Sequence, residues 1–472
     1  MAVRRTWAVA RTMIAEAIRM KIALVLLIVL VAVIPIGPFI WEGDGTLKGR
    51  VQTFLTYSHM LVLVMLSIMT VFVACQSLSK EVTERQIYTI ASKPIPRWQF
   101  ILGKWLGLCL LNAMLLGICG LAIYLFTMYM SGLQADPWDK AALRWEVLVA
   151  RKGVRLPMPD FTDVVEQRFE AFKKTDRYRE VEMTSRLADS IKSSYYSEAR
   201  HRWRSVPPGD LKTWVFEGIH PDPGCEYIHL RYKMRGSPAP AGMQVKCVWL
   251  IGDPTKPGCI PIPRSDSIDQ WHYFPIKSDV VEKDGTLRVT FVNRHAAYLY
   301  TVTTAPTNKS TVTFQEPNGL EVLYEVSSFE SNFVRSMLLI FVWLVPLAAL
   351  GLFAGSFLSF SVGALLCSSV LVTSALSDFV YTAIYYIREA PNPHQDPLDY
   401  FSWIFKPFIM LIINAVPSLD KYNPIDLLAD GRAITWGSLG EAFAVMVLIQ
   451  SVIYLVLAVL IFWKRELAQV TV

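Results

Sequence analysis

Long uncharged stretches alternate with charged segments along the chain, and their lengths predict membrane-spanning helices. Residues 22–40 carry no charge over 19 positions, which suffices to cross about 30 Å of hydrocarbon at about 1.5 Å per residue. Comparable apolar runs occupy 54–78, 100–130 and 441–463. Residues 336–387 are apolar over 52 positions, which predicts two spans that meet near 359–361. The pattern predicts an α-helical polytopic membrane protein with six transmembrane helices.

Two further segments have mixed character. Residues 401–416 are apolar but short, which favours a re-entrant segment over a full crossing. They contain Lys406, Pro407 and Asn414. Residues 1–21 carry five basic side chains and predict a cytoplasmic amphipathic helix in the headgroup region. Its apolar residues at helical spacing are Trp7, Ala10, Ile14 and Ala17. A signal peptide is the alternative, but no small-residue cleavage site follows and further spans come after.

The middle of the chain, 131–332, has the composition of a soluble domain. Its part 139–205 predicts a helical hairpin that turns near 174–178. The apolar residues at helical spacing are Val165, Phe169, Phe172, Leu187, Ile191 and Tyr195. In 210–328 the apolar period changes to two, which predicts a β-sandwich. A clear run is Ile228, Leu230, Tyr232 and Met234. We therefore expect an inserted α+β extracytoplasmic domain made of a helical hairpin plus a β-sandwich.

Lys and Arg residues orient the predicted spans. Five precede the first span, five lie between the second and third, and two lie between the first and second. The positive-inside bias predicts cytoplasmic termini, a cytoplasmic 79–98 loop and an outer insert. A composition of 53% hydrophobic and 18% charged residues excludes an ordinary soluble enzyme. Contact with anionic lipid explains the net charge of +6, so we expect no nucleic acid partner.

The charged stretch between the second and third spans has its own pattern. As a helix, 79–91 would place polar and apolar side chains on opposite sides. The polar side holds Glu81, Glu84, Arg85 and Tyr88, and the apolar side holds Ile87, Ile90 and Ala91. Pro94 and Pro96 end this helix before the third span. Gly103 and Gly107 allow another helix to approach that span closely. An ordinary cytoplasmic loop with helix-end glycines is the alternative.

Residues 81–107 read Glu-x-x-Glu-Arg-x-Ile-x-Thr-Ile-x-Ser-Lys-Pro-Ile-x-Arg-x-x-Phe-x-Leu-Gly-Lys-x-x-Gly. This order resembles the first cytoplasmic loop of ABC-2 type transporter permeases. In that family the loop forms the coupling helix that docks on a separate ATPase subunit. The resemblance carries ATPase coupling to Glu81, Glu84, Arg85, Ile87, Pro94, Arg97, Phe100, Gly103 and Lys104. The chain departs from many members at 85–87, where Arg-Gln-Ile stands in place of Gly-Thr.

The resemblance covers about 1–130 and 333–472 and implies partners. They are a cytoplasmic ABC ATPase subunit and a second permease copy or related permease, in the bacterial cell inner membrane. No Gly-x-x-x-x-Gly-Lys-[Ser/Thr] phosphate loop occurs in the sequence, so ATP hydrolysis is expected in another chain. The expected domains are a helix at 1–21, spans one to three at 22–130, the insert at 131–332, and spans four to six at 333–472.

Few other residues suggest chemistry. Asp378 lies within an apolar run and is a candidate intramembrane polar site. The alternative is that nearby tyrosines mark the outer interface and the carboxylate reaches water. Cys225, Cys247 and Cys259 allow one disulfide outside, and a Cys247 buried on a strand face is the alternative. No catalytic, metal or cofactor site is expected.

Two functions remain open from the sequence. The first is a permease subunit that moves an unidentified substrate across the membrane. The second is a membrane-anchored receptor or mechanical transmitter whose outer β-sandwich binds a ligand or partner without solute transport. Membrane lipid is a partner in both. They differ in whether a continuous polar path runs between the spans.

Overall fold

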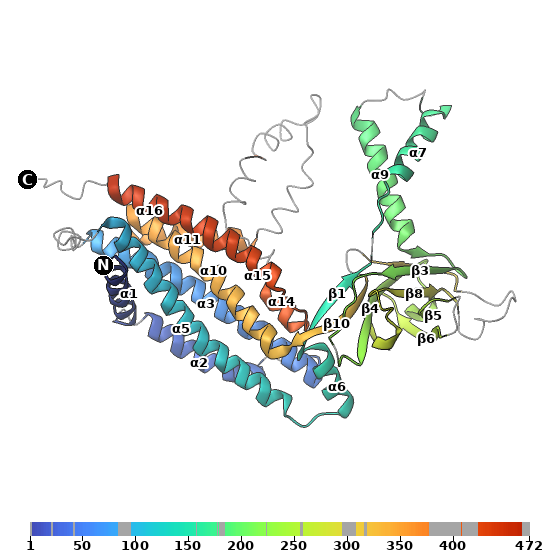
Figure 1. Cartoon of the computed structure of the whole chain (residues 1–472), viewed down its shortest axis with the longest axis horizontal. Coiled ribbons are helices and arrows are strands. Elements are labelled where there is room, and N and C mark those ends of the chain that lie inside the picture. Colours follow the sequence, from blue (N-terminus) through green and yellow to red (C-terminus); the bar gives the residue numbers. More distant parts are fainter. Residues whose placement is uncertain are drawn as a thin grey trace, which may run out of the picture. The chain divides into compact units, whose positions relative to one another are not determined.

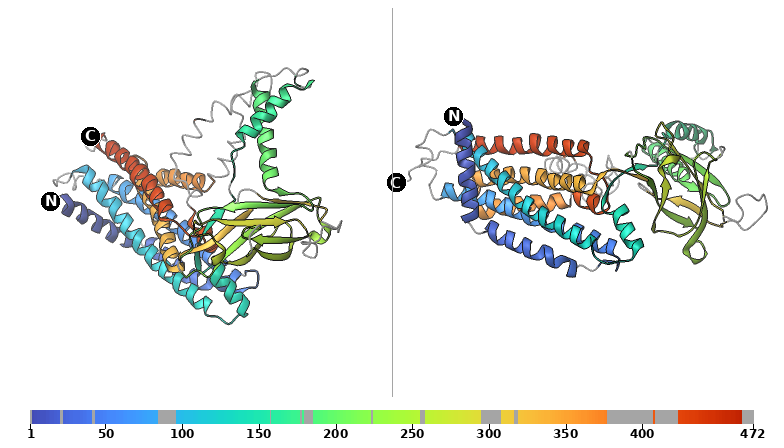
Figure 2. Two further views of the ribbon diagram at one scale, coloured as in Figure 1. Left: turned by 45° about the vertical axis from the view of Figure 1, so that its right-hand side comes forward. Right: turned by 60° about the horizontal axis from the view of Figure 1, so that its bottom comes forward.

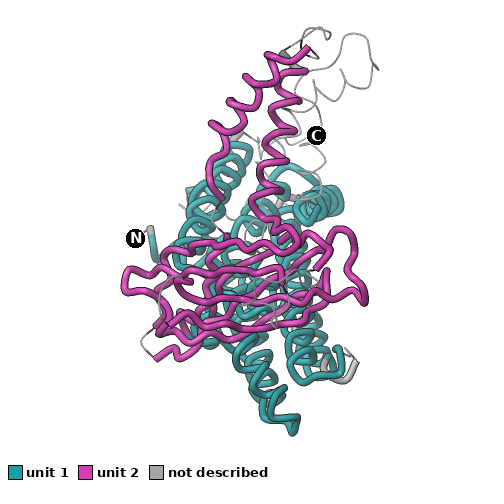
Figure 3. Tube along the Cα trace, turned by 90° about the vertical axis from the view of Figure 1, so that its right-hand side faces the viewer, with its two compact units in different colours: residues 1–150, 328–472 teal, residues 151–327 magenta. Residues whose placement is uncertain are grey.

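A computed structural model describes most of the chain as two units. The described residues are 2–19, 22–40, 43–83, 96–156, 158–176, 178, 185–222, 224–254, 258–294, 308–315, 319–376, 407 and 423–464. Unit 1 comprises 1–150 and 328–472, and unit 2 comprises 151–327 (Figure 3).

Unit 1 is helical. Its elements are α1 (Ala2–Arg19), α2 (Ile22–Ile40), α3 (Leu47–Thr83), α5 (Arg97–Ser131), α6 (Pro137–Glu146), α10 (Phe329–Phe357), α11 (Phe360–Ala375), α14 (Pro424–Ala429), α15 (Trp436–Ala442), the π-helix η5 (Phe443–Ser451) and α16 (Val452–Lys464).

Four helices within the described residues are long and apolar enough to cross a membrane. They are Leu47–Glu81, Arg97–Ser131, Phe329–Phe357 and Trp436–Trp463. Shorter apolar helices occupy Ile28–Gly37 and Phe360–Ala375, inside the first and fifth spans expected from the sequence. The re-entrant segment at 401–416 lies outside the described residues except for Pro407. A membrane-type helical unit is confirmed, and the count of six spans stays a prediction.

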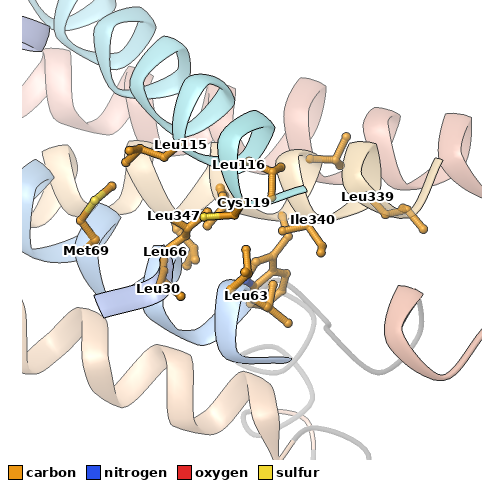
Figure 4. Close-up of a cluster of buried hydrophobic side chains, with 14 of the residues drawn as sticks. Leu30, Leu63, Leu66, Met69, Leu115, Leu116, Cys119, Leu339, Ile340 and Leu347 are labelled. Carbon is orange, nitrogen blue, oxygen red and sulfur yellow. The ribbon is translucent and has the colours of Figure 1, made fainter. Parts of the chain in front are cut away.

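The long helices of unit 1 share one apolar core. Figures 1 and 2 show α3, α5, α10 and α16 side by side. At their centre, Leu66 of α3, Cys119 of α5 and Ile340 of α10 are at most 1% exposed (Figure 4). In an apolar 18-residue stretch of α10, 78% of the helix is buried inside the chain. In the corresponding stretch of Trp436–Trp463, only 28% is buried. Helix α10 is therefore central, and much of the last helix turns apolar surface away from the chain.

Unit 2 contains two β-sheets. The strands are β1 (Val149–Arg155), β2 (Ser205–Val206), β3 (Leu211–Phe216), β4 (Tyr227–Ser237), β5 (Gln244–Ile251), β6 (Ile260–Ser267), β7 (Trp271–Lys277), β8 (Leu287–Val292), β9 (Thr311–Phe314) and β10 (Leu320–Ser328). The six-stranded sheet has the order β1-β10-β4-β9-β2, with β7 paired to β4. The four-stranded sheet has the order β3-β8-β5-β6.

The inward side chains of both sheets form one hydrophobic cluster. Trp249 of β5 is fully buried, and its ring centroid lies 4.8 Å from that of Tyr232 and 5.7 Å from that of Phe314. The predicted strand is confirmed as β4, and its alternate apolar residues Ile228, Leu230, Tyr232 and Met234 all belong to this cluster. The apolar residues at every second position therefore form the inner face of this sheet, because alternate side chains of a strand point to opposite faces.

A helical hairpin is the other part of unit 2. It consists of α7 (Thr162–Lys173) and α9 (Ser185–Trp203), and Figure 3 shows it extending away from the sheets. Val165 and Phe169 are buried in it, as their spacing predicted. Ion pairs join the two helices at Arg168–Glu198 and Lys192–Glu166. Strand β1 also falls within the range that the sequence predicted as helical.

The outer face of the six-stranded sheet carries an ion pair between two side chains with little exposure to solvent. Arg231 of β4 donates from Nη1 to Oε1 of Glu321 on β10 over 2.9 Å. The guanidinium carbon lies 3.9 Å from the ring centroid of Trp271 on β7. The Glu321 side chain is fully buried and that of Arg231 is 10% exposed. This ion pair therefore sits in a poorly solvated place, where removal of one partner is costly.

His229, two residues before Arg231, makes unit 2 sensitive to acid. Burial, and then the charge of Arg151, lower the pKa of His229 from 6.5 to about 4. Because the folded state holds this imidazole neutral, the unfolded state binds the extra proton between pH 6.5 and 4. We expect the free energy of unfolding of unit 2 to fall by about 3 kcal/mol across that window.

Hydrogen exchange of β4 amides, corrected for intrinsic exchange rates, measures this loss. The His229→Leu variant is the control, because carboxyl groups still titrate in it and only the imidazole is absent. The stability of the wild type should fall more steeply below pH 6.5 than that of the variant. Equal slopes would contradict the assignment.

Candidate functional site

A buried lysine joins three helices at one end of unit 1. Lys104 of α5 is 2% exposed. Its Nζ donates to the carbonyl oxygen of Ser77 at 2.8 Å and lies 2.9 Å from Oε2 of Glu81, both on α3. A second carboxylate, Glu16 of α1, lies 3.9 Å from the same nitrogen. We call Glu16, Ser77, Glu81 and Lys104 the Lys104 cluster.

Helix α1 reaches this cluster because α5 has glycines where the two helices cross. A Cβ at Gly103 would lie 2.7 Å from Cβ of Val9, and one at Gly107 would lie 2.7 Å from the carbonyl oxygen of Ala10. Contacts that short do not occur between real side chains and backbone, so any larger residue would force α1 away. The predicted close approach at Gly103 and Gly107 is confirmed, with α1 as the approaching helix.

The face of α1 that packs differs in part from the predicted apolar face. Its buried residues are Thr6, Ala10, Met13 and Ala17. Ala10 and Ala17 were predicted, but Trp7 is 59% exposed. The reason is steric, since contact at glycines selects small residues over the bulky indole. The predicted position of α1 in the headgroup region stays a prediction.

Two more residues of the predicted motif fasten α5 to α16. Arg97 donates from Nη1 to the carbonyl oxygens of Phe462 at 3.1 Å and Trp463 at 2.8 Å. These carbonyls belong to the last turn of α16, where a cation also complements the helix dipole. The rings of Phe100 and Phe462 stack with centroids 6.2 Å apart.

The structure thus places five predicted site residues at one end of unit 1. They are Glu81, Arg97, Phe100, Gly103 and Lys104. Glu84, Arg85, Ile87, Pro94 and Asp378 lie outside the described residues. Residues 79–83, predicted to begin a separate helix, continue α3 to Thr83. Sequence reasoning missed Glu16, although it is the only acidic residue in a helix that otherwise carries only basic charge.

The described residues contain neither a group that could hold a metal ion nor a disulfide bond. No group of three or more His, Cys, Asp or Glu side chains there is arranged to hold a metal ion. All seven cysteines are described and unpaired, including Cys225 and Cys259. Cys247 is 1% exposed on β5, in agreement with the buried alternative. Comparison with known proteins adds no relative, because no protein-family model and no curated protein matches the sequence.

Proposed function

We propose that the chain is the permease subunit of an ABC-2 type transporter, which moves a substrate across the membrane with energy from a separate ATPase subunit. The observation that carries the proposal is the Lys104 cluster. Glu81 and Lys104, which the sequence resemblance assigns to ATPase coupling, form an ion pair in which the lysine is buried and the Glu81 side chain is 14% exposed. They do so on the two helices whose ends, Thr83 and Arg97, flank the charged loop.

This arrangement gives a physical route from the loop to the helices. A partner that pushes on 84–95 displaces the end of α3 and the start of α5. The Lys104 cluster resists separation of α1, α3 and α5, since parting the buried lysine from its carboxylates leaves uncompensated charge. Arg97 connects the end of α16 to these helices, because it donates a hydrogen bond to the carbonyl oxygen of Trp463. A local push therefore tilts several helices together.

The finer features of the proposal follow the resemblance. The chain crosses the bacterial inner membrane six times with both termini in the cytoplasm, and unit 2 contains an outer β-sandwich. It acts as a dimer with a second copy or a related permease. Membrane lipid surrounds the exposed apolar surface of Trp436–Trp463.

The mechanical transmitter remains a second candidate because of one junction. Strand β10 ends at Ser328 and α10 begins at Phe329, with no linker residue between them. The Ser328 hydroxyl also caps α10 by accepting from the backbone N–H of Ser331 at 3.5 Å. Motion of α10 can pass into the sheet through this junction. Transport of labelled lipid or peptide in reconstituted vesicles distinguishes the two functions, since a transmitter moves no solute.

ATPase binding tests the coupling loop most directly. We expect Glu84→Lys and Ile87→Asp each to lower the recovery of a co-purifying ATPase by at least about tenfold, because one reverses a docking charge and the other places a charge in an apolar contact. Glu81→Lys is unsuitable, since it would also break the Lys104 cluster. Arg50→Glu, in the first turn of α3 and exposed, is the matched charge reversal and should leave recovery unchanged. Normal recovery from both loop variants would refute the coupling assignment.

A further inference from the structure

A groove of about 580 Å³ runs between α5 and α10 on the surface of unit 1. Gly117 and Tyr124 line it from α5, and Glu330, Met337 and Phe341 line it from α10. Glu330 and Phe341 are 11 positions apart on one helix, a length of about 16 Å. That length matches one leaflet of a hydrocarbon core about 30 Å thick.

Small residues of α5 create the floor of the groove. A Cβ at Gly117 would meet no atom within 4 Å. One turn along the helix the space narrows, because a Cβ at Gly120 would lie 3.2 Å from Sδ of Met337. The groove therefore has room for an added chain at Gly117, which no side chain of the described residues fills.

Charge distinguishes the two ends of the groove. Glu330, in the first turn of α10, is the single charged residue among the described residues that line it. Helix α10 begins there, directly after its cap at Ser328, and both flanking helices have the length and composition of membrane spans. The groove thus starts at a carboxylate at the end of a span and continues as an apolar channel toward the middle of the membrane.

We infer that this groove binds a phospholipid whose headgroup carries a primary amine. One acyl chain lies against Gly117 between α5 and α10, and the ammonium group pairs with the carboxylate of Glu330. The apolar lining suits hydrocarbon, and the length suits one leaflet. The negative charge favours an aminophospholipid over anionic lipids, whose net charge Glu330 repels. This inference needs the chain in a membrane but does not rest on transport or on an ATPase.

Native mass spectrometry of the purified, delipidated full-length chain tests it. The probes are phosphatidylethanolamine, phosphatidylcholine and phosphatidylglycerol with identical acyl chains. We expect the wild type to bind phosphatidylethanolamine at least about tenfold more tightly than phosphatidylglycerol. Gly117→Trp fills the groove and should abolish this binding. Ile118→Trp is the matched control, because Ile118 is 42% exposed and does not line the groove.

Glu330→Gln separates the headgroup contact from the chain contact. The variant should bind all three lipids with similar affinity, since the groove remains and its charge is gone. It also keeps the test valid if Gly117→Trp does not fold. Equal binding of the three lipids by the wild type overturns the inference, as does unchanged binding by Gly117→Trp. The same spectra report stoichiometry, and a dimer that Gly117→Trp dissociates without any change in lipid binding would show that a second copy occupies the groove.

Discussion

Replacing Lys104 with methionine should lower the free energy of unfolding of the full-length chain in detergent micelles by about 3–5 kcal/mol. The substitution keeps much of the apolar stem but removes the ammonium group that lies 2.9 Å from Glu81. The carboxylates of Glu81 and Glu16, whose side chains are 14% and 31% exposed, then lose the positive charge that lies between them. Titration with a denaturing detergent, followed by helical circular dichroism, measures the change.

Arg50→Met is the control for Lys104→Met, because it removes an exposed cation from the other end of α3. We expect it to change the unfolding free energy by less than about 0.5 kcal/mol. The triple variant Lys104→Met with Glu16→Gln and Glu81→Gln should recover much of the loss, since no charge is left unpaired. A Lys104→Met chain as stable as the wild type would mean that the Lys104 cluster does not hold α1, α3 and α5 together.

Glu321→Ala should destabilise unit 2 by a similar amount, about 3–5 kcal/mol. It removes the carboxylate that lies 2.9 Å from the Arg231 guanidinium, and the Arg231 side chain is only 10% exposed. Hydrogen exchange of β4 and β10 peptides in the full-length chain localises the loss to the six-stranded sheet. Protection in unit 1 should not change.

A double replacement separates the ion pair from simple packing. Arg231→Met with Glu321→Leu removes both charges and keeps apolar volume, so we expect a loss well below that of Glu321→Ala. Glu325→Ala is the matched single variant, because Glu325 lies on the same strand and is exposed. If the double replacement proves as damaging as Glu321→Ala, the contact acts through shape and not through charge.

Periodicity predicted much of this architecture because it reflects which side of an element is buried. The apolar runs at 54–78 and 100–130 became α3 and α5, and the alternation at 228–234 became the inner face of β4. Strand β1 was not predicted. Its sequence, Val-Ala-Arg-Lys-Gly-Val-Arg, shows no sustained alternation, and it forms a strand by pairing with β10, which is more than 150 positions away.

Some features of the candidate site could likewise be predicted from the sequence, and others could not. Spacing alone indicated that Gly103 and Gly107 admit a helix, since four residues bring small side chains to one face. It could not identify that helix as α1. Spacing along one helix also could not indicate that Glu81 contacts Lys104, 23 positions later on another helix. Local spacing describes neighbours on one helix, whereas burial of Lys104 depends on helices brought together by the fold.

The order of the Lys104 cluster along the chain has a consequence for biosynthesis. Glu16, Ser77 and Glu81 all precede Lys104, so each partner has already been made when the lysine leaves the ribosome. Because chains fold from their N-terminal parts during synthesis, the ammonium group can be neutralised soon after it is made. Arg97 differs, since its acceptors at 462 and 463 are made more than 360 residues later. The first contact can therefore form early, and the second closes the helical unit after α16 emerges.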